Sequence, residues 1–138
     1  MKTFPSLTDL ADADLQNVLL VWQGLGYYSR AKRIHQSSKL LVDFIGKNNC
    51  EDPSSWPVDL EMWLSLPGIG RTTAGSIISS AFDISEPILD GNVKRIFSRL
   101  LGNERTSIKE YKRLFEFSSL LISTISPRDF NQALMDLG

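Results

Sequence analysis

The chain has 138 residues, 42% hydrophobic and 22% charged, which is typical of one ordinary globular domain with a real core. Its short apolar runs exclude a membrane-spanning helix and a signal peptide. With 15 basic and 16 acidic side chains the net charge is −1, so any nucleic-acid surface must be a local patch. Cys50 is the single cysteine, which excludes an internal disulfide and a thiolate metal cage, and we expect an intracellular protein of the cytoplasm or nucleoid.

Apolar residues recur with the 3.6-residue period of helices, and the alternation typical of strands is missing from the sequence. Asp59 can cap a helix that runs into Pro67, and Ser126 precedes a proline at the first position of the last helix. The sequence therefore predicts an all-α protein of about six or seven helices in one domain, 1–138. The predicted helices cover 15–22, 27–46, 59–66, 71–82, 93–100, 111–125 and 127–137.

Each predicted helix carries one apolar stripe that we expect to face the core. These stripes are Leu15, Val18, Leu19 and Trp22; Ile34, Leu41, Phe44 and Ile45; Leu60, Trp63 and Leu64; Ala74, Ile77, Ile78 and Ala81; Val93, Ile96, Phe97 and Leu100; Tyr111, Leu114, Leu121, Ile122 and Ile125; and Phe130, Ala133, Leu134 and Leu137.

Basic residues gather between Tyr27 and Lys39, a segment with four cations and no acidic residue. Such a local patch of positive charge suits a polyanion. His35 lies within it and is interpreted as a surface or packing residue, because the chain has no second histidine for a metal site. Cys50 lies in the irregular stretch 46–58 and is interpreted as an incidental loop thiol.

A helix, a four-residue turn and a second helix occupy residues 59–82. Pro67 ends the first helix, while Gly68 and Gly70 permit positive φ and leave no Cβ to block a ligand. The free N–H groups at the start of the next helix favour an anion, so the turn suits a phosphate held without reading sequence. A turn whose glycines serve geometry alone is the alternative.

A lone carboxylate, Asp90, begins the helix at 93–100 in the segment 88–95. Its simplest role is a helix cap, but a rigidly held capping carboxylate can also stabilise positive charge that develops on a sugar. Lys94 and Arg95 suit flanking phosphates, or else form a solvated helix face. Glycosidic cleavage usually needs a second acid, and neither Glu86 nor Asp136 lies in a motif that supplies it.

Taken together, these motifs resemble the helix-hairpin-helix DNA glycosylase superfamily, and within it the adenine mismatch glycosylases (the MutY type). The resemblance extends over nearly the whole chain, with its motifs in the family's order. They are Phe4-Pro5 with Leu10-Ala11; Trp22-Gln23-Gly24-Leu25-Gly26-Tyr27-Tyr28-Ser29-Arg30-Ala31; the turn Leu66-Pro67-Gly68-Ile69-Gly70-Arg71-Thr72; Leu89-Asp90-Gly91-Asn92-Val93-Lys94-Arg95; and Phe130-Asn131-Gln132-Ala133-Leu134-Met135-Asp136-Leu137-Gly138.

The resemblance implies a six-helix barrel that binds double-stranded DNA and flips out an adenine mispaired with 8-oxoguanine or guanine. Asp90 would be the catalytic aspartate, with Asn92 beside it, and no side chain would bind a metal. Leu25 and Tyr27 would be wedge residues that hold an unstacked step open, although Tyr27 and Tyr28 also fit a helix-start core. The other implied DNA contacts are Gly68, Ile69, Gly70, Arg71, Thr72 and Lys94.

Thr72 separates two close relatives within the superfamily. Enzymes similar to endonuclease III carry at this position a lysine that attacks the sugar and forms a Schiff base, which threonine cannot do. Residues 91–95 also resemble the adenine subfamily. We therefore expect a monofunctional glycosylase, which does not cut the strand.

Members of the family carry three further parts. These are a glutamate-bearing segment that should precede Phe4, four cysteines for a 4Fe-4S cluster after the position of Gly138, and a domain that recognises 8-oxoguanine. We therefore expect the chain to be the central barrel of a longer, monomeric protein, with the cluster in the intact protein and no cofactor in this chain. Alone, the chain should fold, bind DNA weakly and release little or no adenine.

Three other interpretations stay open at this point. The chain could be a non-catalytic helix-hairpin-helix DNA-binding module in which Asp90 only caps a helix. It could belong to a glycosylase of the same fold with thymine or uracil mismatch specificity. A purely structural helical bundle would bind DNA without the steep salt dependence that phosphate contacts cause.

Overall fold

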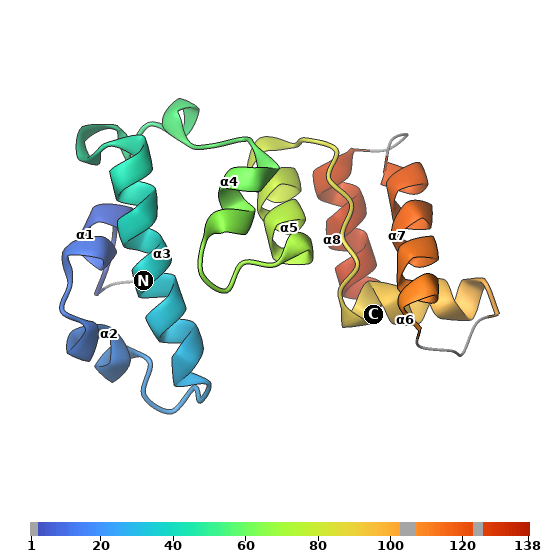
Figure 1. Cartoon of the computed structure of the whole chain (residues 1–138), viewed down its shortest axis with the longest axis horizontal. Coiled ribbons are helices and arrows are strands. Elements are labelled where there is room, and N and C mark those ends of the chain that lie inside the picture. The colour runs from blue at the N-terminus through green and yellow to red at the C-terminus, as the bar shows by residue number, and fades with distance from the viewer. Residues whose placement is uncertain (1–2, 103–106, 123–125) are drawn as a thin grey trace. The chain divides into compact units, whose positions relative to one another are not determined.

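A computed structural model of the chain describes residues 3–102, 107–122 and 126–138. All regular structure in these ranges is helical, which confirms the all-α prediction (Figure 1). None of these helices is long and apolar enough to cross a membrane. The α-helices are α1 (Leu7–Asp12), α2 (Leu15–Val21), α3 (Tyr28–Ile45), α4 (Leu60–Ser65), α5 (Arg71–Phe82), α6 (Gly91–Leu100), α7 (Ile108–Ile122) and α8 (Pro127–Leu137), and the 3₁₀ helices are η1 (Lys47–Asn49) and η2 (Pro53–Ser55).

The chain divides into two compact units, residues 1–69 and 70–138, and each is described by itself. In the first unit, α1 and α2 both pack on the long helix α3 (Figure 1). The buried side chains there include Val18, Leu41 and Ile45. Ile34 and Phe44 were expected in the core but are exposed, because the contacts of α1 and α2 cover only part of the circumference of α3.

Helix α1 is the element that the apolar period did not predict. At six residues it is too short to display a period, but it begins with a capping box. The hydroxyl of Ser6 accepts from the N–H of Asp9 at 3.1 Å, and the Asp9 carboxylate accepts from the N–H of Ser6 at 3.2 Å. The chain then turns at Ala13, whose carbonyl lies 3.0 Å from Nε2 of the buried His35. His35 is therefore a packing residue.

The second half of this unit leads from η1 to the hairpin turn. Trp63 is buried, donates from Nε1 to the carbonyl of Pro57 at 2.8 Å and stacks on Trp56. Cys50, which lies between η1 and η2, is buried too. The hydroxyl of Ser37 on α3 donates to the carbonyl of Pro67 at 3.1 Å, which fixes the first half of the turn on α3.

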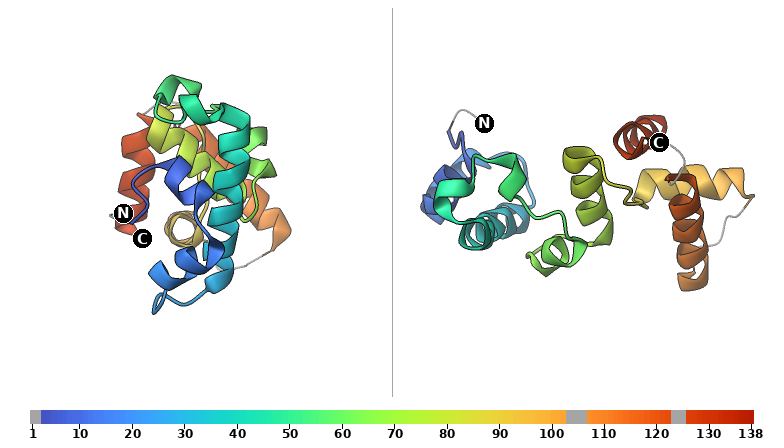
Figure 2. Two further views of the ribbon diagram at one scale, coloured as in Figure 1. Left: turned by 90° about the vertical axis from the view of Figure 1, so that its left-hand side faces the viewer. Right: turned by 90° about the horizontal axis from the view of Figure 1, so that it is seen from above.

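In the second unit, α8 packs on α5, α6 and α7, and α6 runs crosswise to α7 (Figures 1 and 2). The centre of its core is Phe97, which meets Phe117 edge to face with ring centroids 5.1 Å apart. The buried members of this cluster are Ile88, Leu89, Val93, Phe97, Leu114 and Leu134.

Five stripe residues of this unit are exposed and do not face its core as expected. Leu100 and Leu137 each lie in the last turn of their helix, and the other three are Ala81, Tyr111 and Ala133. The inward face of α8 carries Asn131 and Leu134 instead. Ile125, assigned to the stripe of α7, lies outside the described residues.

Candidate active site and DNA-binding surfaces

Asp90 stands at the N-cap of α6, as its position before an apolar helix predicts. Its Oδ1 accepts a hydrogen bond from the N–H of Val93 at 2.8 Å, and the residue is half-buried. No other described residue donates a hydrogen bond to this carboxylate. One oxygen therefore fixes the side chain to the helix start while the other stays available to a ligand.

The carboxylate opens onto a pocket of about 220 Å³ within the second unit. Side chains of α5 form one wall of the pocket, and Ile88 and Met135 contribute apolar surface to the rest. Asp90 is the only acidic group among its described lining residues, so the pocket holds one negative charge in a largely apolar surrounding. That setting strengthens the attraction between a carboxylate and positive charge on a bound sugar. The lining residues from α5 are Thr72, Thr73, Ser76 and Ile77.

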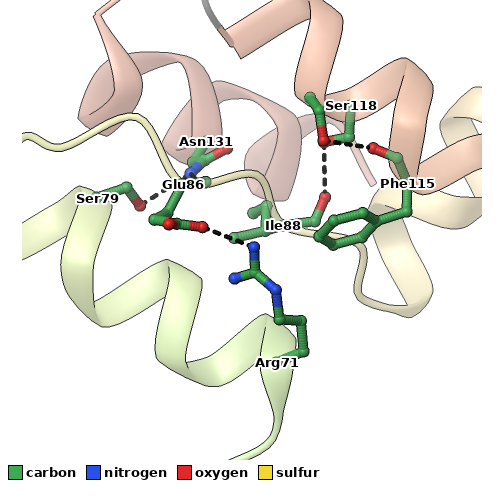
Figure 3. A network of polar contacts seen from close by, with 8 residues as sticks. Arg71, Ser79, Glu86, Ile88, Phe115, Ser118 and Asn131 are labelled. Carbon is green, nitrogen blue, oxygen red and sulfur yellow. Dashed lines mark hydrogen bonds and ion pairs between the residues drawn. The ribbon is translucent and has the colours of Figure 1, made fainter. Parts of the chain in front are cut away.

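The segment that delivers Asp90 runs without regular structure from the end of α5 to α6, and side chains of other helices hold its carbonyls. Asn131 Nδ2 donates to the carbonyl of Glu86 at 3.0 Å, and the Ser118 hydroxyl donates to that of Ile88 at 2.9 Å (Figure 3). The Thr72 hydroxyl donates to the carbonyl of Leu89 at 3.3 Å. Thr72 therefore serves the segment as well as lining the pocket.

Gly75 permits the close approach of this segment to α5. A Cβ at Gly75 would lie 2.8 Å from the carbonyl oxygen of Pro87, closer than such atoms approach. The sequence gives no local sign of this contact, since Gly75 lies inside a helix where glycine is ordinarily unfavourable.

The other polar residues of α6 divide between the protein and the solvent. Arg95 Nη2 donates to Asn92 Oδ1 at 2.5 Å and to the carbonyl of Gly138 at 2.8 Å, so these groups tie the start of α6 to the end of α8. Asn92 is half-buried, one position beyond Gly91. Lys94 forms no hydrogen bond or ion pair within the described residues, which leaves its ammonium group free for an anion.

The two glycines of the turn differ in what they do for the fold. Gly68 has φ +80, and a Cβ there would lie 2.6 Å from Cδ of Arg33, so glycine is required. Ile69 donates from its N–H to the carbonyl of Leu66 at 3.2 Å, which closes the turn. Gly70 has φ −94 and open space around its Cα, so any residue would fit its conformation.

Side chains cap most of the helix starts, but not those of α3 and α5. Carboxylate or hydroxyl groups of Ser6, Asp14, Asp59 and Asp90 cap α1, α2, α4 and α6. Asp83 accepts from the N–H of Arg128 at 3.2 Å and so serves α8. The N-cap residues of α3 and α5 are Tyr27 and Gly70, and neither forms such a bond, which leaves the first N–H groups of these helices to water or a ligand.

The loop before α3 presents Leu25 and Tyr27 to solvent, 66% and 73% exposed. Trp22 Nε1 donates to the carbonyl of Gly26 at 2.8 Å and so braces the loop. Tyr27 has φ +48, a left-handed conformation that is strained for a bulky residue, and Arg30 lies 4.7 Å from its ring centre. A helix-start core position is therefore wrong for Tyr27, and for Tyr28, which is exposed too.

The described residues contain no group of three or more histidine, cysteine and acidic side chains that could hold a metal ion. A 4Fe-4S cluster needs four thiolates. The sequence has one cysteine, Cys50, so its own residues do not fit such a cluster.

Residues 1–119 match the family model of the HhH-GPD superfamily of base excision DNA repair proteins, and the chain belongs to this superfamily. Over 140 residues it is 38% identical to the adenine DNA glycosylase of Mus musculus, with 100% of this chain and 26% of that protein covered. It is 36% identical, also over 140 residues, to the adenine DNA glycosylase of Buchnera aphidicola subsp. Schizaphis graminum, with 38% of that protein covered. The chain thus spans well under half the length of these relatives.

Solved structures are similar to this chain in fold. A thermostable thymine-DNA glycosylase is similar in fold with a TM-score of 0.79 at 22% identity, over 98% of this chain and 60% of that one. A non-covalent endonuclease III–DNA complex matches with a TM-score of 0.66 at 25% identity, over 93% of this chain and 55% of that one. The fold is thus that of base excision glycosylases.

Proposed function

We propose that this chain is the DNA-binding and aspartate-bearing part of an adenine DNA glycosylase, which removes adenine mispaired with 8-oxoguanine or guanine and leaves the strand uncut. The observation that carries the proposal is the Asp90 carboxylate, held through one oxygen by the cap of α6 and open through the other to the pocket. The names of the relatives at 36–38% identity support adenine as the base.

In this proposal the flipped nucleotide enters the pocket beside Asp90. As the bond between the base and the sugar breaks, positive charge develops on the sugar, and the carboxylate stabilises it. Water adds to the sugar carbon, and the departing adenine takes up a proton. Asp90 is the only acid among the described pocket residues, so a second acidic group from outside this chain would protonate the base. Thr72 has no amine, so no Schiff base forms.

The uncapped helix starts support the proposed grip on DNA. Phosphate oxygens can bind the free N–H groups of α5 at Gly70, and Lys94 can neutralise a neighbouring phosphate. Leu25 and Tyr27 are exposed apolar side chains on a braced loop, a form that suits insertion next to the mispair. Gly68 and Ile69 shape the turn.

The proposal is tested first on the chain alone. We expect weak binding to duplex DNA whose logarithmic affinity falls linearly with the logarithm of salt concentration, measured by fluorescence anisotropy. We expect little or no adenine release in a single-turnover assay, because Asp90 is the only acid among the described pocket residues. Appreciable release by the chain alone would contradict the claim that a second acid from outside this chain is needed. Binding without salt dependence would favour a purely structural bundle.

Gly70→Ser is expected to weaken DNA binding about tenfold. The same substitution should stabilise the fold by a few tenths of a kcal/mol. The hydroxyl can accept from the N–H groups of α5 that the phosphate would otherwise bind, and open space surrounds the Cα of Gly70. Thermal unfolding and anisotropy measure the two effects. Gly70→Ala is the matched control, because it adds a Cβ without a capping oxygen. Unchanged affinity in both variants would mean that the N–H groups at the start of α5 do not bind a phosphate.

Tyr27→Gly is expected to leave the free energy of unfolding within about 0.5 kcal/mol of that of the unmodified chain. Relief of the strain of the left-handed conformation offsets the greater backbone freedom of glycine in the unfolded chain. Mismatch binding should nevertheless weaken, since the wedge is lost. Asp83 is the matched comparison, because it is the other described non-glycine residue with positive φ, at +54.

Asp83→Gly should cost about 1 kcal/mol, since Asp83 accepts from the N–H of Arg128 at the start of α8. Urea denaturation gives both free energies of unfolding. A loss at Tyr27→Gly as large as that at Asp83→Gly would mean that the tyrosine serves the fold.

A further inference from the structure

Arg71 begins α5, where the sequence suggests a contact to DNA, yet its side chain faces the protein. Nη2 lies 2.8 Å from Oε2 of Glu86, and the guanidinium stacks 5.1 Å from the ring centre of Phe115 (Figure 3). The two charged side chains are 34% and 21% exposed. Nη1 is buried and has no hydrogen-bond partner among the described residues. Nη1 and Nη2 therefore cannot together bind a phosphate, because Nη1 is buried and Nη2 is occupied by Glu86.

Glu86 would also oppose a phosphate at this place. A phosphate oxygen that took Nη2 would leave a partly buried carboxylate without its partner and add a second negative charge beside it. The ion pair and the DNA contact are thus alternatives, and the structure shows the ion pair.

The partner of Arg71 opens the segment that ends at Asp90. Within 86–90 the carbonyl groups of Glu86, Ile88 and Leu89 are held by side chains of α8, α7 and α5. Asn131, which holds the first of them, also donates to the hydroxyl of Ser79 at 2.8 Å. Because no neighbouring strand pairs with this segment in the described structure, its position depends on the burial of Ile88 and Leu89 and on these polar anchors. The ion pair is the only charged anchor among them.

We propose that Arg71 is a positioning residue for Asp90, acting through Glu86, and not a contact to the DNA backbone. The pair fixes the start of the segment 86–90 against α5, so that the carboxylate of Asp90 keeps its place at the pocket. The proposal rests on the proposed function for its catalytic consequence, but the positioning itself can be measured without DNA.

Amide hydrogen exchange in the chain alone tests the positioning. Arg71→Gln and Glu86→Gln should each speed the exchange of the Val93 amide, which donates to Asp90, by about fivefold to tenfold. The double variant should add little, since either change breaks the same pair. Arg71→Lys should keep part of the protection. Arg128→Gln, which alters another arginine of this unit, should leave this amide unchanged.

An equal acceleration of all core amides would reduce Arg71 to a general stabilising residue and overturn the proposal. So would an unchanged Val93 amide in Arg71→Gln.

The salt dependence of DNA binding tests whether Arg71 contacts the DNA backbone. The slope of log affinity against log salt should stay the same in Arg71→Gln and fall by about 0.9 in Lys94→Gln. In the longer protein expected from the sequence, Arg71→Gln should lower single-turnover adenine release about tenfold at unchanged DNA affinity, with partial recovery in Arg71→Lys.

A slope lowered by about 0.9 in Arg71→Gln would identify a phosphate contact and overturn the proposal. If the unmodified chain fails to bind DNA, the proposed function fails, and the exchange of the Val93 amide still decides whether Arg71 positions Asp90.

Discussion

Asp90→Asn is expected to lower the single-turnover rate of adenine release by about 10²- to 10³-fold in the longer protein, with the fold intact. Asparagine caps helices about as well as aspartate, so the hydrogen bond from the Val93 N–H persists and stability should change little. What is lost is the negative charge that faces the developing positive charge on the sugar. The base released from a labelled duplex, followed by rapid quench, gives the rate.

Asp14→Asn is the matched control for this substitution. Asp14 caps α2 by accepting from the N–H of Gln16 at 3.2 Å, and it lies in the other unit from the pocket. Its replacement should leave the rate of release unchanged. If Asp90→Asn behaves in the same way as Asp14→Asn, Asp90 is only a helix cap and the chain is a binding module.

Phe97→Ala is expected to destabilise the second unit by about 3–5 kcal/mol. Phe97 is 1% exposed, lies at the centre of the core of that unit and meets Phe117 edge to face. The substitution removes most of this burial and leaves a cavity that neighbouring helices can fill only in part. Because small domains are stable by only about 5–15 kcal/mol, the unit should unfold at much lower urea concentration.

The control for this prediction lies on the same helix. Leu100 is 70% exposed, so Leu100→Ala should change the free energy of unfolding by no more than about 0.5 kcal/mol. Urea titration followed by circular dichroism measures both variants. A cost below about 1 kcal/mol at Phe97 would contradict the assigned core.

The boundaries of α4 and α8 were predictable from the sequence because their signals are local, whereas α7 begins at Ile108, three residues before its predicted start. Asp59 caps α4 by accepting from the N–H of Met62 at 3.2 Å, and Pro127 takes the first position of α8. Burial was harder to predict. The helical period of apolar residues shows which residues share a stripe, but not how far the surface that packs against the stripe extends. Phe44 and Leu100 continue their stripes beyond that surface and are exposed.

The candidate site was predictable only in its contiguous parts. Asp90 was found because it lies in a motif, whereas its anchors lie far away in sequence. Ser118 is 30 residues from Ile88, and Asn131 is 45 residues from Glu86. Both resemble ordinary polar helix residues, and only the position of Asn131 one turn before Leu134 on an inward stripe indicates burial. The inward turn of Arg71 likewise depends on Glu86, 15 positions away.

The most direct measurement compares base release by the longer protein from three duplexes under single-turnover conditions. They carry adenine opposite 8-oxoguanine, thymine opposite guanine and uracil opposite guanine. We expect release of adenine alone, with the strand intact until alkali is added. Release of thymine or uracil, strand cleavage without alkali, or no release of adenine would contradict it.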